Sequence, residues 1–269
     1  MVRSRKDMRT TDFGVLYFVD DNPGYQRMLR ASIESLRRFH PDWPVKVIAQ
    51  RCYHVPLWKR IYRGVSVWKW SARHARSNMD YRVICAKNEA FCQTPFELTL
   101  FIDADTVIMR PLDTLRRQAE GHDVLANPFP WCQYQGLEPW QPTTFQHLNS
   151  GVIFYNRRFI DVFREYSERT KHTLGRYHAN QFTFSLACEM EKERLRIGLD
   201  SSIQVETMNL AKILQTGGYP RVGDLIDLRW EGLSRFHVFH YNGPHKAEYL
   251  ALIKQLWNLP SDEKGLDAG

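Results

Sequence analysis

The apolar residues of this chain form short runs and periodic stretches that alternate from residue 13 onward. Residues 13–19 are a nearly continuous apolar run of β-favouring side chains, which predicts a strand buried on both faces. In residues 25–39 the apolar positions recur at steps of three and four, which predicts an amphipathic helix. Residues 45–48 form the next apolar run. A strand, a helix and a strand in this order predict a βαβ unit in a parallel sheet.

The same alternation continues toward the C-terminus. Further strands are predicted at 98–102, 148–155 and 235–241, and further helices at about 85–91, 159–170 and 246–257. We therefore expect an α/β protein whose mostly parallel central sheet is flanked by helices. A single domain is expected over residues 13–258, between a basic arm (1–12) and a polar tail (259–269).

The composition is that of a packed globular protein, because 43% of the 269 residues are hydrophobic and 25% are charged. The apolar run nearest the N-terminus is far shorter than the ~20 residues that cross a bilayer, and no secretory signal pattern precedes it. The five cysteines form no Cys-x-x-Cys pair, which argues against a disulfide framework and a thiolate zinc site. We expect a reduced, cytoplasmic location.

Positive charge is concentrated in residues 51–76, which contain seven basic residues, no acidic residue and several interleaved aromatic side chains. A solvated basic face, with the tryptophans packed in the core, is the first interpretation of this segment. Peripheral contact with an anionic membrane, on its cytoplasmic face, is the alternative. Nucleic acid is not expected as a partner because no recognised binding motif accompanies the charge.

Two carboxylates directly follow the predicted strand 98–102. Asp103 and Asp105 are separated by Ala104, and residues i and i+2 of an extended chain project to the same side. They should face one point beyond the carboxyl end of the strand, where open α/β sheets bind ligands. Two like charges this close imply a bound cation or a shared proton. A pair of solvated loop acids is the structural alternative.

A second polar cluster follows the predicted strand 235–241. His240 stands at the end of that strand, Gly243 lies in the following turn, and Lys246 opens the predicted last helix. An imidazole added to two carboxylates makes a ligand set that suits Mn²⁺ or Mg²⁺ better than structural Zn²⁺. An ordinary strand–turn–helix junction with a surface histidine is the alternative.

Neutral amides mark two further positions. Asn149 and Ser150 precede Gly151 at the start of the predicted strand 148–155, where glycine permits close approach of a ligand. Asn180 and Gln181 lie among apolar residues, in a pattern that is more often the surface of a helix than a site.

Together these motifs resemble the retaining glycosyltransferases of family 8 and their relatives with the GT-A fold, especially bacterial lipopolysaccharide galactosyl- and glucosyltransferases. The resemblance extends over nearly the whole chain, and its most specific part is His-x-x-Gly-x-x-Lys at 240–246. It implies a GT-A type nucleotide-diphospho-sugar transferase fold and a UDP-sugar donor. It also implies a hexosyl acceptor that is a glycan, a lipid-linked molecule or a small molecule.

The resemblance implies a role for each motif. Asp103, Asp105 and His240 correspond to metal ligands, with Ala104 between the two acids. The residues that correspond to the donor-binding positions are Asp20, Asn22, Tyr25, Lys87, Ala104, Asn149, Ser150, Gly243 and Lys246. Of these, Asp20, Asn22 and Tyr25 correspond to the nucleotide pocket, although Tyr25 comes two residues later than usual.

The catalytic positions differ from the family pattern in one residue. The family usually carries Asp-Gln where this chain has Asn180-Gln181, which leaves the identity of the donor sugar open. Because an amide is a poor nucleophile, we assign Gln181 to stabilising the oxocarbenium-like sugar through its carbonyl oxygen. Retention of anomeric configuration follows from the resemblance alone.

Two rival functions fit part of the pattern. A haloacid-dehalogenase-like phosphatase also uses an Asp-x-Asp after a hydrophobic strand, but it places that motif on its first strand. Here about a hundred residues precede the motif. A non-catalytic protein that binds sugar nucleotides is the other rival, and the complete set of predicted metal ligands argues against it.

Overall fold

The computed structural model describes residues 11–20, 22–50, 65–70, 86–129, 132–133, 142, 144–170, 179–206 and 235–240, with 65–70 described by backbone alone. Residues 1–10 of the predicted arm, the polar tail and the predicted helix at 246–257 therefore lie outside the described residues, and the last two residues of the arm begin the first strand. The boundaries of the predicted single domain stay a prediction.

A seven-stranded sheet forms the centre of the described part, in the order β10-β6-β9-β4-β1-β2-β3. Its strands are β1 (Thr11–Val19), β2 (Val45–Gln50), β3 (Val65–Trp70), β4 (Phe96–Asp103), β6 (Val124–Pro128), β9 (Leu148–Asn156) and β10 (Ile197–Leu199). Neighbouring strands are parallel except around β9, which runs antiparallel to both β4 and β6. The mostly parallel sheet is thus confirmed.

Two smaller sheets accompany the central one. One consists of β11 (Gln204–Glu206), β12 (Val238–His240) and β5 (Thr106–Ile108), and the other of β7 (Cys132–Gln133) and β8 (Thr144–Phe145). Strand β5 begins only three residues after Asp103, so the chain passes from the large sheet into the three-stranded sheet at the Asp-Ala-Asp turn.

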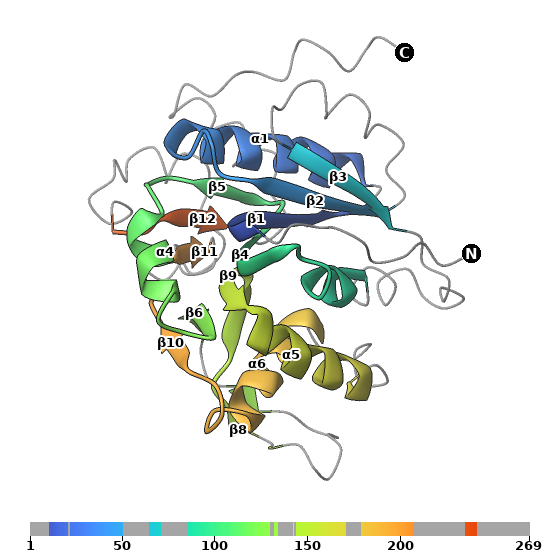
Figure 1. Ribbon diagram of the computed structural model, residues 1–269, viewed down its shortest axis with the longest axis vertical. Coiled ribbons are helices and arrows are strands. Elements are labelled where there is room, and N and C mark those ends of the chain that lie inside the picture. The colour runs from blue at the N-terminus through green and yellow to red at the C-terminus, as the bar shows by residue number, and fades with distance from the viewer. Residues whose placement is uncertain are drawn as a thin grey trace, which may run out of the picture.

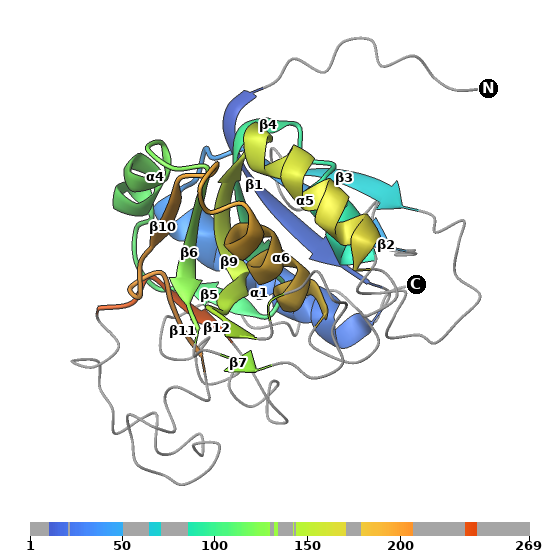
Figure 2. The same ribbon diagram turned by 90° about the horizontal axis from the view of Figure 1, so that it is seen from below.

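Helices cover both faces of the central sheet (Figures 1 and 2). Helix α1 (Pro23–Phe39) packs on one face, and α5 (Arg157–Arg169), α6 (Ala179–Met190) and the helical residues 86–91 pack on the other. Helix α4 (Asp113–Ala119) packs in the same core as α1, next to β6 and β9. Alternate residues of β1 enter the two cores, Val15 and Tyr17 on the side of α1 and Leu16 and Phe18 on the other. This two-sided burial explains why residues 13–19 are apolar without a break.

Most predicted elements are present close to their expected bounds. The strands expected at 13–19, 45–48, 98–102 and 148–155 correspond to β1, β2, β4 and β9, and the helices at 25–39 and 159–170 correspond to α1 and α5. Of the strand expected at 235–241 the structure describes residues 235–240, and among these residues 238–240 are extended, as β12. Seven of the described strands were not predicted, namely β3, β5, β6, β7, β8, β10 and β11.

The basic segment 51–76 contains edge strand β3, which pairs in parallel with β2. The side chains of this segment lie outside the described part, so both the solvated-face and the membrane interpretation stay untested. Among the helices that the structure describes, none is long and apolar enough to cross a bilayer.

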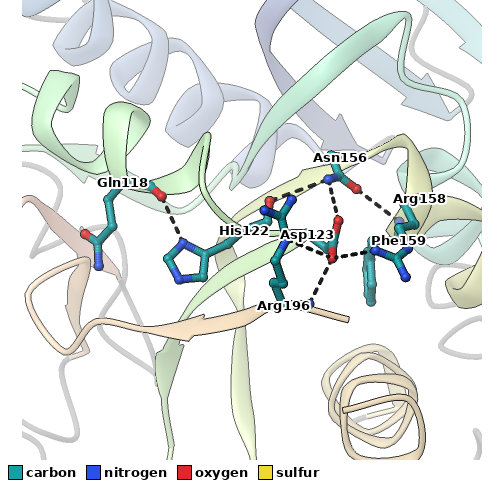
Figure 3. A network of polar contacts seen from close by, with 7 residues as sticks. All are labelled: Gln118, His122, Asp123, Asn156, Arg158, Phe159 and Arg196. Atoms are coloured by element: carbon teal, nitrogen blue, oxygen red, sulfur yellow. Dashed lines mark hydrogen bonds and ion pairs between the residues drawn. The ribbon is translucent and has the colours of Figure 1, made fainter. Parts of the chain in front are cut away.

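A buried carboxylate joins β6, α5 and the start of β10 (Figure 3). Asp123 accepts hydrogen bonds from Asn156 Nδ2 and from the backbone N–H of Arg196, both at 2.8 Å. The guanidinium groups of Arg158 and Arg196 lie 3.5 and 3.7 Å from Asp123 Oδ2. Burial alone would raise the pKa of Asp123, but these donors and charges outweigh it and hold the pKa below its ordinary value.

We expect Asp123→Asn to lower the free energy of unfolding by ~2 kcal/mol at pH 7, because the new amide N–H₂ would face the donors that now bind Oδ2. Since the folded-state pKa is depressed, this stabilisation is present above the unfolded-state pKa of about 4 and is lost as the pH falls through the folded-state pKa. The difference from wild type in urea unfolding should therefore shrink below about pH 4. Asp161→Asn, in an exposed pair with Arg164, is the control and should change stability by less than ~0.5 kcal/mol. An equal effect of the two substitutions would contradict this assignment.

Candidate functional site

The carboxyl ends of β1 and β4 lie side by side and bring two predicted motifs together. The strands are parallel, and Phe18 of β1 pairs with Asp103 of β4. Asp20 therefore follows β1 beside the point where the Asp-Ala-Asp turn leaves β4. This is the edge at which open α/β sheets bind ligands.

Strand β12 brings His240 to the same turn from a distant part of the sequence. It runs antiparallel to β5, and His240 pairs with Thr106, the residue after Asp105. The Nε2 atom of His240 lies 3.3 Å from Asp105 Oδ1 and 3.8 Å from Asp103 Oδ2. The structure thus brings together the three residues predicted as metal ligands.

These three side chains fit a hard divalent cation. One ligand atom from each of Asp103, Asp105 and His240 can be chosen so that all lie within 4.8 Å of one another. Ligands bound at ~2.1 Å on a six-coordinate cation lie roughly 3–4 Å apart, so a small contraction would complete the set. Asp105 and His240 are buried, at 6% and 7% exposure, which leaves their charges little solvent screening. Two carboxylate oxygens and one imidazole match Mn²⁺ or Mg²⁺.

Lys87 supplies a positive charge at the same point. Its ammonium lies 2.7 Å from Asp103 Oδ1 and 2.9 Å from Oδ2. Burial raises the pKa of Asp103 and the neighbouring Asp105 raises it further, while Lys87 and His240 oppose the rise. Lys87 was predicted to bind the donor. In this structure Lys87 pairs with Asp103, one of the expected metal ligands, and its positive charge offsets part of the negative charge of the two carboxylates.

Gly151 on β9 makes the space that His240 occupies. A Cβ atom built on Gly151 would lie 2.4 Å from His240 Cε1 and 2.6 Å from Nδ1. Asn149 Oδ1 accepts a hydrogen bond from the Gly151 N–H at 2.7 Å, and Ser150 is buried between them. The Asn-Ser-Gly motif was predicted to contact the donor. In the described structure this motif also packs β9 against the imidazole of His240.

A chain of buried hydroxyl groups holds the Asp-Ala-Asp turn, and the sequence analysis did not find it. Thr106 Oγ1 donates to the Asp103 carbonyl oxygen at 2.9 Å. Ser32 Oγ of α1 lies 2.9 Å from Thr106 Oγ1, and Tyr17 Oη lies 3.1 Å from Ser32 Oγ. The two carboxylates therefore stand on a turn that is anchored to both β1 and α1.

A cavity of about 190 Å³ opens beside the carboxylates. Its walls are Phe18, Val19, Asp20, Tyr25, Lys87, Asp103, Ala104 and Asp105. Asn22 has a different position, because its exposed side chain caps α1 by accepting a hydrogen bond from the Gly24 N–H at 2.8 Å. Of the three residues predicted for the nucleotide pocket, Asp20 and Tyr25 thus line this cavity.

The predicted catalytic amides stand at the start of α6. Asn180 Nδ2 donates to Asn88 Oδ1, and Gln181 Nε2 lies 3.2 Å from His147 Nδ1. Neither Asn88 nor His147 was predicted, although each is close in sequence to a predicted residue, Lys87 and Asn149. Gly243 and Lys246 lie outside the described residues.

No family model matches this chain, and no curated protein matches its sequence. Solved glycosyltransferases nevertheless share its architecture. The bifunctional glycosyltransferase WbbM aligns over 94% of this chain and 52% of its own, with 14% identity and a TM-score of 0.55. The galactosyltransferase LgtC, in complex with donor and acceptor sugar analogues, aligns over 90% of this chain and 95% of its own, with 13% identity and a TM-score of 0.54. Mouse xyloside xylosyltransferase 1 aligns over 86% and 98%, with 16% identity and a TM-score of 0.54.

The chain has the GT-A glycosyltransferase fold. It spans about half the length of WbbM and nearly all of LgtC. The fold class implied by the sequence resemblance is therefore confirmed, with β9 as the antiparallel strand of the sheet. The phosphatase alternative expects its Asp-x-Asp motif on the first strand, whereas Asp103 ends β4.

Gly151→Ala should displace His240 and weaken Mn²⁺ binding by ~10-fold or more, because the added methyl group occupies the place of the imidazole. Mn²⁺ affinity can be measured by electron paramagnetic resonance of the free ion. Gly121→Ala is the matched control, since its nearest neighbour would be the Gln118 carbonyl oxygen at 3.5 Å. Unchanged Mn²⁺ affinity in a folded Gly151→Ala protein would exclude His240 from the metal site.

Proposed function

We propose that this protein is a metal-dependent glycosyltransferase that moves a hexose from a UDP-sugar to an acceptor, with retention of anomeric configuration. The observation that supports this most strongly is the convergence of Asp103, Asp105 and His240 beside a cavity in a GT-A fold. The donor and acceptor sugar analogues of the LgtC complex belong to a structure with the same fold. They are the basis for extending sugar transfer to this chain.

Asp103, Asp105 and His240 would hold Mn²⁺ or Mg²⁺. When bound, the ion supplies positive charge that stabilises the diphosphate leaving group. Lys87, whose ammonium is already at this point, adds a second positive charge against the same phosphates. By resemblance, Lys246 binds phosphate as well, and Gly243 lets the backbone approach it.

The cavity beside the carboxylates is the proposed nucleotide pocket. Asp20 would accept a hydrogen bond from the uracil, and the ring of Tyr25 would stack on the base. Asn22 would act through its cap on α1, which holds the helix that carries Tyr25. Asn149 and Ser150, on the strand that also supports His240, would contact the donor sugar. The acceptor pocket would be built from loops such as residues 128–145, a segment rich in aromatic residues, most of which lies outside the described residues.

Gln181 and Asn180 are the proposed catalytic amides. The carbonyl oxygen of Gln181 would face the anomeric carbon and stabilise the positive charge that develops there. Its amide N–H₂ lies near His147, an arrangement that leaves the oxygen for the sugar. A glutamine-to-glutamate variant of LgtC is described as an active-site mutant, which supports a role for a glutamine in this fold.

Asp105→Ala and His240→Ala should each abolish metal-dependent UDP binding in a protein that remains folded. Each substitution removes one of three ligands, and titration calorimetry with UDP in the presence of Mn²⁺ measures the loss. Asp161→Ala, on the exposed face of α5, is the control and should bind UDP as wild type does. Wild-type UDP affinity in both site variants would place the nucleotide elsewhere.

Gln181→Ala should leave UDP affinity unchanged and lower UDP release from the best UDP-sugar by roughly 10²–10³-fold, as expected for loss of one group that acts in the transition state. Gln118→Ala, on α4, should release UDP at the wild-type rate. UDP binding without turnover of any UDP-sugar by the wild-type protein would favour a non-catalytic binding protein. A product with inverted configuration by NMR would overturn retention.

A further inference from the structure

Two buried amides near the proposed active site leave one hydrogen-bonding atom each without a partner. Asn180 Nδ2 donates to Asn88 Oδ1 at 2.5 Å. Among the residues that the structure describes, Asn88 Nδ2 and Asn180 Oδ1 have no hydrogen-bond partner. The two residues are only 1% and 7% exposed. Because an unsatisfied buried polar group is costly and uncommon, a pair of them in direct contact indicates a missing partner, either a buried water or a group of a ligand.

The amide pair is bracketed by residues of the proposed site. Asn88 directly follows Lys87, which contacts both oxygens of Asp103. Asn180 directly precedes Gln181, whose amide lies near His147. The contact between Asn88 and Asn180 thus links the segment that reaches the metal centre to the segment with the proposed catalytic amide. A donor sugar would lie between these two places.

The unpaired atoms define the kind of group that would bind. One is a donor and the other an acceptor, and they belong to two side chains in contact. If both amides are turned over, so that oxygen and nitrogen change places, one donor and one acceptor are still left unpaired. The argument therefore does not depend on how the two amides are oriented. A hydroxyl group can donate to the acceptor and accept from the donor at the same time. A carboxylate can only accept, an ammonium can only donate, and a trans acetamide directs its N–H and C=O to opposite sides.

We propose that Asn88 and Asn180 together bind one hydroxyl group of the donor sugar and so determine which UDP-sugar is accepted. This inference rests on the proposed function and adds a residue, Asn88, that neither the motif pattern nor the fold assigns. A sugar that lacks this hydroxyl, or carries it in the other configuration, would leave both amides unsatisfied. Sites built to hydrogen-bond a substrate hydroxyl reject the analogue without it strongly.

The test is a thermodynamic cycle between the amides and the sugar hydroxyls. Binding of UDP-glucose, UDP-galactose and their 2-, 3-, 4- and 6-deoxy analogues is measured by calorimetry with Mn²⁺, in the full-length protein. In the wild type, removal of one particular hydroxyl should weaken binding at least 10-fold. In Asn88→Ala and Asn180→Ala, removal of that same hydroxyl should change affinity less than about 3-fold.

Thr183→Val is the matched control. Thr183 lies on α6 near Asn180 and is fully buried, and its hydroxyl contacts Thr170 Oγ1 at 2.8 Å on a part of the helix that the proposal does not use. This variant perturbs the same helix and should keep the wild-type pattern of discrimination. Asn88→Ser and Asn180→Ser serve in the same cycle if either alanine variant does not fold.

The outcomes separate this inference from the proposed function. If the wild type binds UDP with Mn²⁺ but the asparagine variants discriminate among the deoxy analogues as it does, the amide pair is structural and the inference fails alone. It also fails if no deoxy position matters in the wild type. If UDP itself does not bind with Mn²⁺, the proposed function fails and the inference with it.

Discussion

The mutual repulsion of Asp103 and Asp105 is the constraint on which this site depends. Their carboxylates stand on one short turn, with Asp105 almost fully buried, where solvent screens their charges poorly. Such a pair is tolerated only with positive charge close by or with a shared proton. Lys87 provides part of this positive charge from another segment of the chain. The arrangement matches the binding of a divalent cation.

The surrounding structure holds the two acids in this position. The hydroxyl chain from Tyr17 through Ser32 to Thr106 holds the turn against β1 and α1. The pairing of β12 with β5 brings the imidazole of His240 to the turn. Gly151 leaves room for that imidazole. These contacts involve strands from both the central and the three-stranded sheet, so the proposed metal site lies where the two sheets meet.

Local pattern was enough to predict the strands that are buried on both faces and the helices with one apolar stripe. The meeting of Asp103, Asp105 and His240 was expected from the family resemblance together with their places at the ends of predicted strands. Strands β6 and β10 were missed for physical reasons. The first contains Asn127 and Pro128, and the second has only three residues, so neither has a run long enough to be distinguished from a loop.

The contacts that complete the site depend on register between distant segments, which no local pattern encodes. Asn88 and Asn180 are 92 positions apart, and Lys87 reaches Asp103 over 16. The antiparallel direction of β9 was likewise not evident from its apolar sequence. Because of this direction, Asn149 and Gly151 at the start of β9 lie at the edge of the sheet where β4 ends. Residue type indicated candidates here, and the fold decided which of them are neighbours.

The most direct test of the central claim is the location of the ion itself. Crystals grown with UDP and Mn²⁺ and measured at the manganese absorption edge would give an anomalous peak. The account predicts one peak within about 2.5 Å of a carboxylate oxygen of Asp105 and of Nε2 of His240, with the diphosphate on its open side. A manganese peak elsewhere, with His240 still paired directly to Asp105 in the presence of bound UDP, would contradict it.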